Sequence, residues 1–183
     1  MKKTSLLLIL LTFIGIGITI SCEPDDICPE STPTTPSLII DAYDVDNPEN
    51  KKAITKLLVG GVDNDNILPG YGIISATQIV LPLKTDANTT QYVLIKDAFV
   101  NDNATPDDTS DDYFDGNTDI ITINYTREEV YVSRACGYKT IYKNVTFTIE
   151  PESNDENWIK SRQPLNDNQS VEDETETHFN IFH

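Results

Sequence analysis

Residues 144–150 read NVTFTIE, and this stretch decides the fold. Apolar side chains occupy every second position, at Val145, Phe147 and Ile149, and polar side chains stand between them. Successive side chains of a β-strand point to opposite faces, so a period of two turns one face to a core and the other to water. The stretch therefore predicts a half-buried strand.

The same alternation recurs from Ser37 onward, and residues 121–125 repeat it with Ile121, Ile123 and Tyr125. The short apolar runs are rich in Ile, Val, Thr and Tyr and are separated by Asn, Asp, Gly and Pro, which is typical of strands and turns. Further strands are predicted near residues 37–45, 53–60, 73–83, 91–98, 129–135, 138–143 and 177–182. Such closely spaced runs favour antiparallel pairing, with hairpin turns at 126–128 and 136–137.

Roughly seven to nine strands must bury their apolar faces, and the sequence offers no amphipathic helix to cover them. We therefore expect an all-β fold, an antiparallel β-sandwich that forms a single domain over residues 37–183, with a small β-barrel as the alternative. Residues 152–176 are mostly polar. Within them, Trp158 is interpreted as a lid at the edge of the core rather than a platform for a ligand.

The N-terminus has the features of an export signal. Lys2 and Lys3 precede an apolar run from Leu6 to Ile20. A membrane-spanning helix needs about 20 apolar residues, and this run is shorter. Residues 1–21 are therefore expected to be a cleaved signal peptide.

Residues 18–22, ITISC, resemble the processing site of bacterial lipoproteins. Ser21 supplies the small residue before the cut and Cys22 the thiol that carries the lipid, although Thr19 stands where leucine is usual. Two or more acyl chains hold a protein stably on a bilayer. We expect lipid attachment at Cys22 and a place in the cell envelope; the alternatives are ordinary cleavage near Ser21 and an uncleaved anchor.

The sequence contains three cysteines. If Cys22 carries lipid, Cys28 and Cys136 remain as a pair in an oxidising compartment, where disulfides persist. A Cys22–Cys28 disulfide is the alternative, and it would exclude lipidation. A catalytic Cys136 is least favoured, because the histidines are His178 and His183 and nothing nearby would activate a thiolate.

The chain has 13 basic and 30 acidic residues and a net charge of −17. This balance excludes a sequence-wide nucleic-acid footprint and opposes attraction to anionic lipid headgroups, so a lipid would have to hold the protein on the membrane. The acidity is interpreted as a solvated surface. Residues 22–36, rich in proline and acids after the cysteine, are expected to be a tether.

Residues 101–119, NDNATPDDTSDDYFDGNTD, form an acidic segment that is interpreted as a flexible, solvated loop. Calcium prefers several carboxylate oxygens, but Tyr113 and the absence of a closing glutamate depart from the EF-hand pattern. No metal or other cofactor is expected. The weak candidates for a metal site are Asp107, Asp108, Asp111, Asp112 and Asp115.

Common catalytic motifs are absent, including G-x-S-x-G, H-E-x-x-H and the phosphate-binding G-x-x-x-x-G-K. We therefore expect a non-enzymatic binding or structural module with a protein partner in the envelope. A carbohydrate- or calcium-binding surface lipoprotein is the alternative.

Four segments together resemble a family of small Bacteroidota lipoproteins, the domain of unknown function 6452: CEPDDIC (22–28), TPSLII (35–40), LPL (81–83) and VSRACGY (132–138). The resemblance implies a lipoprotein with its second and third cysteines at these places. The acids after Cys22 also resemble signals for export to the surface of the outer membrane. The resemblance brings no catalytic residues.

Overall fold

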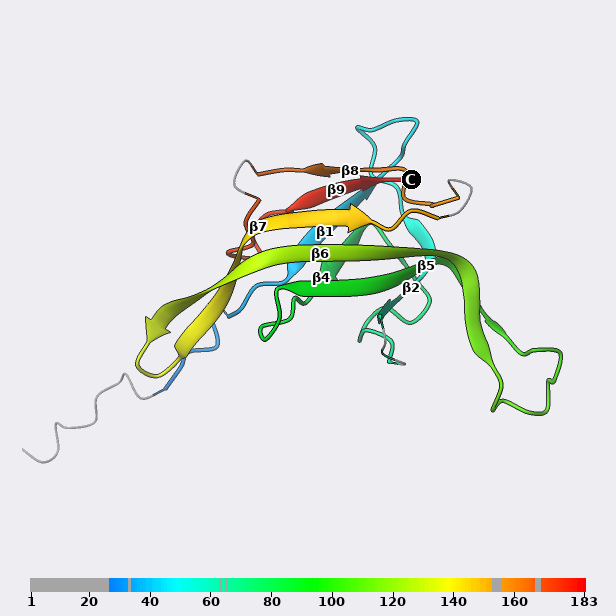
Figure 1. The fold of residues 1–183 in the computed structure, drawn as a ribbon, viewed down its shortest axis with the longest axis horizontal. Coiled ribbons are helices and arrows are strands. Elements are labelled where there is room, and N and C mark those ends of the chain that lie inside the picture. Colours follow the sequence, from blue (N-terminus) through cyan, green and yellow to red (C-terminus); the bar gives the residue numbers. More distant parts are fainter. Residues whose placement is uncertain (1–26, 33, 63, 65, 153–155, 167–168) are drawn as a thin grey trace, which may run out of the picture. The chain divides into compact units, whose positions relative to one another are not determined.

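The computed structural model describes residues 27–183 except 33, 63, 65, 153–155 and 167–168. The expected signal peptide, Cys22 and the start of the tether lie outside these residues. Nine strands make up the regular structure of the described chain (Figure 1). They are β1 (Leu38–Tyr43), β2 (Ile54–Gly61), β3 (Ile74–Ala76), β4 (Gln78–Leu81), β5 (Thr89–Asn101), β6 (Tyr113–Ser133), β7 (Gly137–Ile149), β8 (Ser161–Pro164) and β9 (Phe179–Phe182).

The strands form two sheets, with the orders β4-β1-β9-β8 and β3-β2-β5-β6-β7. The sheets pack together without closing into a barrel, so the predicted β-sandwich is confirmed. One pair departs from the antiparallel expectation: β1 and β9 run parallel, with Ile40 opposite Phe179. No described segment forms a helix long and apolar enough to cross a membrane.

The alternation in residues 144–150 corresponds to a strand with one buried face, as predicted. Val145 and Phe147 are fully buried, whereas Thr146 and Thr148 are exposed. The Phe147 ring meets the ring of Phe179 from the other sheet edge-on, with centroids 5.5 Å apart. This strand therefore supplies the contact between sheets that its sequence pattern required.

The predicted turn at residues 126–128 is wrong, because β6 runs through it without a break. These residues are polar and exposed, so the alternation fades although the backbone stays extended beside β7 and beyond the end of β5. The Thr126 hydroxyl donates to the carbonyl of Lys143 at 3.0 Å. The turn predicted at 136–137 is confirmed, and Gly137 there has a φ of 71°.

The run predicted as one strand over 73–83 is divided at Thr77 between the two sheets. β3 pairs with β2, and β4 pairs with β1. The amide of Ala42 donates to the Thr77 carbonyl at 2.9 Å, at the point where the chain changes sheets. The polar stretch 152–176 also contains a strand that was missed, β8, which pairs with β9 alone at the edge of its sheet.

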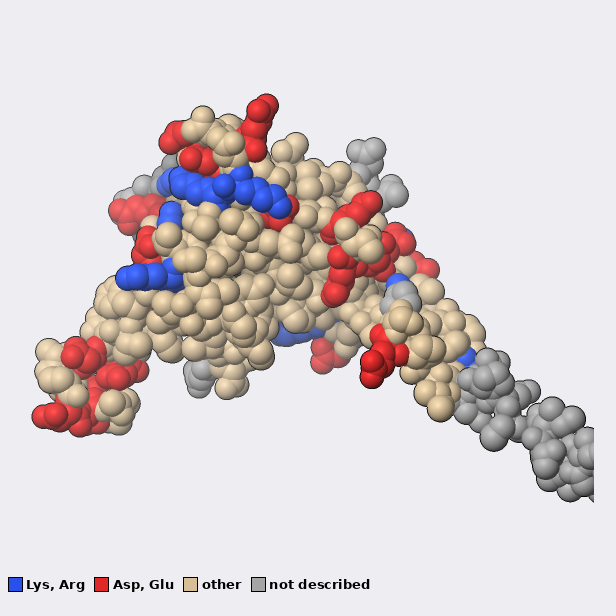
Figure 2. All heavy atoms as spheres, turned by 180° about the vertical axis from the view of Figure 1, so that it is seen from behind, with Lys and Arg blue, Asp and Glu red and all other residues tan. Residues whose placement is uncertain are grey.

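The acidic segment 101–119 is strand at both ends, which confines the predicted loop to its middle. β5 extends to Asn101 and β6 begins at Tyr113, so the connection is only residues 102–112. Figure 2 shows acidic side chains gathered at this connection, at the lower left of the view. A bulge between Lys96 and Phe99 lies against Gly116, where an added Cβ would stand 2.7 Å from Ile95 Cγ2.

The described chain divides into two compact units. Residues 27–32 and 131–139 form the disulfide unit, and residues 34–130 and 140–183 form the sandwich unit. The tip of the β6–β7 hairpin belongs to the disulfide unit.

Candidate functional site

A groove of about 620 Å³ opens on the sandwich unit between the connection that follows β2 and the start of β5. Its lining residues are Gly61, Val62, Asn64, Asn66, Ile67, Leu68, Pro69, Pro82, Leu83, Lys84, Thr90, Gln91 and Tyr92. The groove thus brings together three segments of sequence, none of which was predicted as a site.

One wall of the groove is formed by residues 82–84. Side chains form hydrogen bonds to the backbone of these residues and of Thr85, which follows them. Their four consecutive carbonyls each accept a hydrogen bond from a different side chain; in order, the donors are Tyr92, Tyr142, Tyr125 and Arg127. The second and third of these bonds measure 2.9 Å. Because each donor is held in a strand, the wall is preorganised rather than a mobile loop.

The donor tyrosines stay protonated, as this arrangement requires. Burial, with a smaller effect from neighbouring tyrosines, raises the pKa of Tyr92 to about 12 and that of Tyr142 to about 12. Burial also raises the pKa of Tyr125, although its hydrogen bond with Thr90 opposes the shift. The three hydroxyls are therefore hydrogen-bond donors over the physiological pH range.

Lys84 is fixed through both of its backbone groups. Its amide donates to the Thr90 hydroxyl at 2.9 Å, and its carbonyl accepts from Tyr125 at 2.9 Å. The hydroxyls of Thr90 and Tyr125 are themselves 2.6 Å apart. The side chain of Lys84 is exposed and carries a positive charge at the rim of the groove.

The opposite wall is the connection after β2, which folds back on that strand. The Leu68 amide donates to the Val59 carbonyl at 2.8 Å, and the Asn66 amide donates to the Asn64 side chain at 2.9 Å. Asp63 and Asp65, in the same connection, lie outside the described residues.

The groove is lined mainly by uncharged side chains. Its described lining combines the amide side chains of Asn64, Asn66 and Gln91 with proline, leucine and isoleucine surface. No His, Cys, Asp or Glu belongs to that described lining. Amides donate and accept hydrogen bonds without transferring protons, so the lining suits a polar, uncharged group such as a peptide backbone.

A buried carboxylate at Asp119 was missed by the sequence analysis. It is fully buried and accepts hydrogen bonds from the Ile159 amide at 2.8 Å, the Asn157 side chain at 3.1 Å and the Trp158 amide at 3.3 Å. Burial raises the pKa of Asp119, against the effect of these bonds. The sequence does indicate this burial. Asp119 stands two positions before Ile121 in the same strand, so both side chains point to the core.

Asp119 holds Trp158 in place, and this tryptophan is a core residue. Only 4 % of it is exposed, and its indole nitrogen donates to the Leu94 carbonyl at 3.3 Å. Trp158 packs in the main apolar cluster of the sandwich. Trp158 therefore lies within the core rather than over its edge, and it offers no surface for stacking a ligand.

The acidic candidates for a metal site are not brought together. Asp111 accepts from Asn103 at 3.0 Å and from Thr105 at 2.8 Å, and Asp108 accepts from the Ser110 amide at 3.0 Å. Asp107 and Asp112 lie in the same connection, whereas Asp115 lies in β6. The residues that the structure describes contain no group of three or more His, Cys, Asp or Glu side chains that could hold a metal ion.

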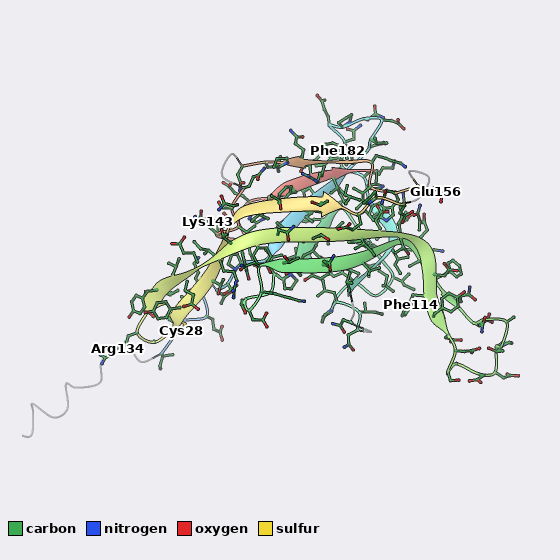
Figure 3. All side chains as sticks on the ribbon, viewed as in Figure 1. Cys28, Phe114, Arg134, Lys143, Glu156 and Phe182 are labelled. Atoms are coloured by element: carbon green, nitrogen blue, oxygen red, sulfur yellow. A yellow bond between two sulfur atoms is a disulfide. The ribbon has the colours of Figure 1, made fainter. Side chains whose placement is uncertain are left out.

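Cys28 and Cys136, 108 positions apart in sequence, are joined by a disulfide. This is the pair that the cysteine count favoured. The bond closes the disulfide unit at the turn between β6 and β7, close to Arg134 (Figure 3).

Together these features define a β-sandwich domain with a preorganised, amide-lined groove and a disulfide at one hairpin turn. A family model matches residues 56–183, and its description is the family of unknown function DUF6452. The match covers more than half of the chain and includes the whole groove and Cys136, so the chain belongs to this family. No curated protein and no solved structure matches it.

Proposed function

We propose that this protein is a lipid-anchored module of the bacterial cell envelope that binds a protein partner through its groove and has no catalytic role. The observation that carries the proposal is the Cys28–Cys136 disulfide, because it uses both of the other cysteines, so that no further cysteine of this chain can pair with Cys22 at the end of the signal-like segment. A disulfide of this kind also suits an oxidising compartment outside the cytosol.

A lipid at Cys22 would hold the protein on the membrane despite its strongly negative net charge. Each buried methylene contributes about 0.8 kcal/mol, so two acyl chains suffice for a stable anchor. The acids that follow Cys22 suit the outer membrane, with the domain in the periplasm or at the cell surface.

The groove supports the binding role. Association is weakened when a flexible segment must become ordered on binding. The hydrogen bonds to the four carbonyls of residues 82–85 order this segment before a partner binds and so reduce that cost. The amide side chains of the lining fit the backbone of a protein segment. The buried Trp158 and the locally bonded acids of the 102–112 connection favour this role over the alternative, carbohydrate or calcium binding at the surface.

Replacing Cys22 tests the anchor. We expect Cys22→Ala to move the protein from the membrane fraction to the soluble envelope fraction, because no acyl chain can be attached. The double variant Cys28→Ala/Cys136→Ala is the control and should stay with the membrane. A mass spectrum of the wild-type protein that shows unmodified Cys22, or Cys22 in a disulfide, would refute the anchor.

A photo-crosslinking residue placed in the groove tests the binding role in intact cells. We expect a crosslinked partner from position 91, in the groove, and none from position 163 on β8. Both positions hold an exposed glutamine, so the two variants are matched in residue type and exposure. Equal crosslinking at both positions, or no reproducible product at position 91, contradicts a partner in the groove.

A further inference from the structure

The disulfide unit exposes apolar side chains around its turn. Ile27 is 79 % exposed, Tyr131 58 % and Tyr138 67 %. The rings of Tyr131 and Tyr138 meet edge-on with centroids 5.4 Å apart, so they form one aromatic surface rather than two isolated side chains. We name Ile27, Tyr131 and Tyr138 the aromatic tip.

The aromatic tip borders a groove within the same unit. This groove has a volume of about 520 Å³ and is lined by Ile27, Pro29, Thr32 and residues 131–135. None of the described residues of the unit is among the buried apolar residues of the protein. The described part of this unit therefore has no apolar core into which the exposed side chains could pack.

The covalent structure limits how far the aromatic tip can lie from a lipid on Cys22. Six residue steps separate Cys22 from Cys28, and a fully extended chain covers about 3.6 Å per step, so the two lie within about 22 Å of each other. The disulfide then holds Cys136, with its Cα 4.9 Å from that of Cys28. Lipidation of Cys22 would thus keep the turn between β6 and β7 within about 27 Å of the lipid-bearing residue, and so within reach of the membrane surface.

The chemistry of the tip suits that surface. Tyrosine has an apolar ring and a polar hydroxyl, and it is enriched where hydrocarbon meets headgroups. The described part of the disulfide unit carries Arg134 and Lys139 against one acid, Glu30, in contrast to the −17 of the whole chain. Three acids of the tether precede the unit, so we assign the contact to the aromatic side chains rather than to charge.

We propose that the aromatic tip inserts at the boundary between the headgroups and the acyl chains of the bilayer and forms a second membrane contact beside the lipid on Cys22. The proposal rests on the lipid anchor of the proposed function. The disulfide is the device that brings the tip to the membrane, because Tyr131 and Tyr138 are more than 100 positions from Cys22 along the chain.

Tryptophan scanning in vesicles tests the proposal. The full-length lipoprotein is reconstituted in phosphatidylcholine vesicles with brominated acyl chains, which quench tryptophan on contact. We expect Tyr131→Trp and Tyr138→Trp to lose emission relative to unbrominated vesicles, because residues 131 and 138 meet the lipid. Tyr113→Trp is the matched control, since Tyr113 is 50 % exposed but belongs to the sandwich unit, and it should be unaffected.

The buried Trp158 supplies the same background in every variant. Equal emission in the two vesicle types for both tip variants, with the lipid on Cys22 verified by mass spectrometry, would overturn the tip contact and leave the anchor intact. Equal quenching at residue 113 would also overturn it. A protein without lipid on Cys22 would refute the anchor itself, and the tip contact with it.

Discussion

The sandwich unit and the disulfide unit hold their structures by different means. The sandwich unit contains every buried apolar residue among those described, and the disulfide unit contains none. In place of a core, the disulfide unit has the Cys28–Cys136 bond and keeps Tyr131 and Tyr138 at its surface. A short segment cannot bury enough apolar area to order itself, so a covalent bond supplies what packing cannot. The difference separates a part stabilised by an apolar core from a part stabilised by a covalent bond.

The largest expected effect is the loss of a ring from the core. Phe147→Ala should lower the free energy of unfolding by about 3–5 kcal/mol, because Phe147 is fully buried and packs against Phe179. Tyr131→Ala, in the disulfide unit, should change it by no more than about 0.5 kcal/mol. Denaturant titration measures both. Similar losses in the two variants would show that the disulfide unit has a core after all.

The second effect is that of the disulfide. Cys28→Ala/Cys136→Ala should lower the free energy of unfolding by about 2–4 kcal/mol, since the bond closes a long loop in the unfolded chain. The wild-type protein under reducing conditions is the control and should unfold at the same denaturant concentration as the double variant. An unchanged midpoint in both would mean that the bond orders the hairpin turn without stabilising the sandwich.

The third effect concerns the wall of the groove. Tyr142→Phe should lower the free energy of unfolding by about 1–2 kcal/mol, because the Leu83 carbonyl loses its hydrogen bond in a buried setting. Tyr113→Phe, at an exposed tyrosine hydroxyl that bonds Asn101, should have little effect. Hydrogen exchange should also speed up at the amides of residues 83–85 in the first variant alone. Unchanged exchange there would contradict the account of a preorganised wall.

The smallest effect is a dependence of stability on pH, confined to the sandwich unit because both histidines lie there. Burial lowers the pKa of His178, whose Nδ1 accepts from the Ile39 amide at 2.9 Å. The unfolded state therefore binds the proton first, and stability falls as the pH drops below the ordinary value of 6.5.

Melting temperatures between pH 7 and 5 measure this dependence, with His178→Gln as the comparison. The variant should show a shallower fall than the wild type. Asp119 acts with the opposite sign, because burial raises its pKa and stability then falls as the pH rises above 3.8. The difference between variant and wild type in the slope of melting temperature against pH gives the contribution of His178. Identical slopes would exclude that contribution.

Where the apolar alternation was strong, the sequence was enough to predict the strand and its buried face. Residues 144–150 and 121–125 have the predicted burial because their side chains meet a core on one face only. Where both faces are polar, as at 126–128 and in β8, the pattern vanishes although the backbone remains paired. The groove could not be predicted, because its walls come from three segments whose contacts depend on how the sheets are connected.

By itself, the sequence determined that the chain is an all-β protein, which face of the strongly alternating strands is buried, and that Cys28 and Cys136 are the favoured pair once Cys22 is assigned to lipid. These follow from local periodicity and from counting. Only the tertiary structure decided that β3 and β4 join different sheets and that the side chains of Tyr92, Tyr125, Arg127 and Tyr142 bond four successive carbonyls. The physical reason is that alternation shows which face of a strand is buried, whereas its hydrogen-bond partners are chosen by neighbours far away in sequence.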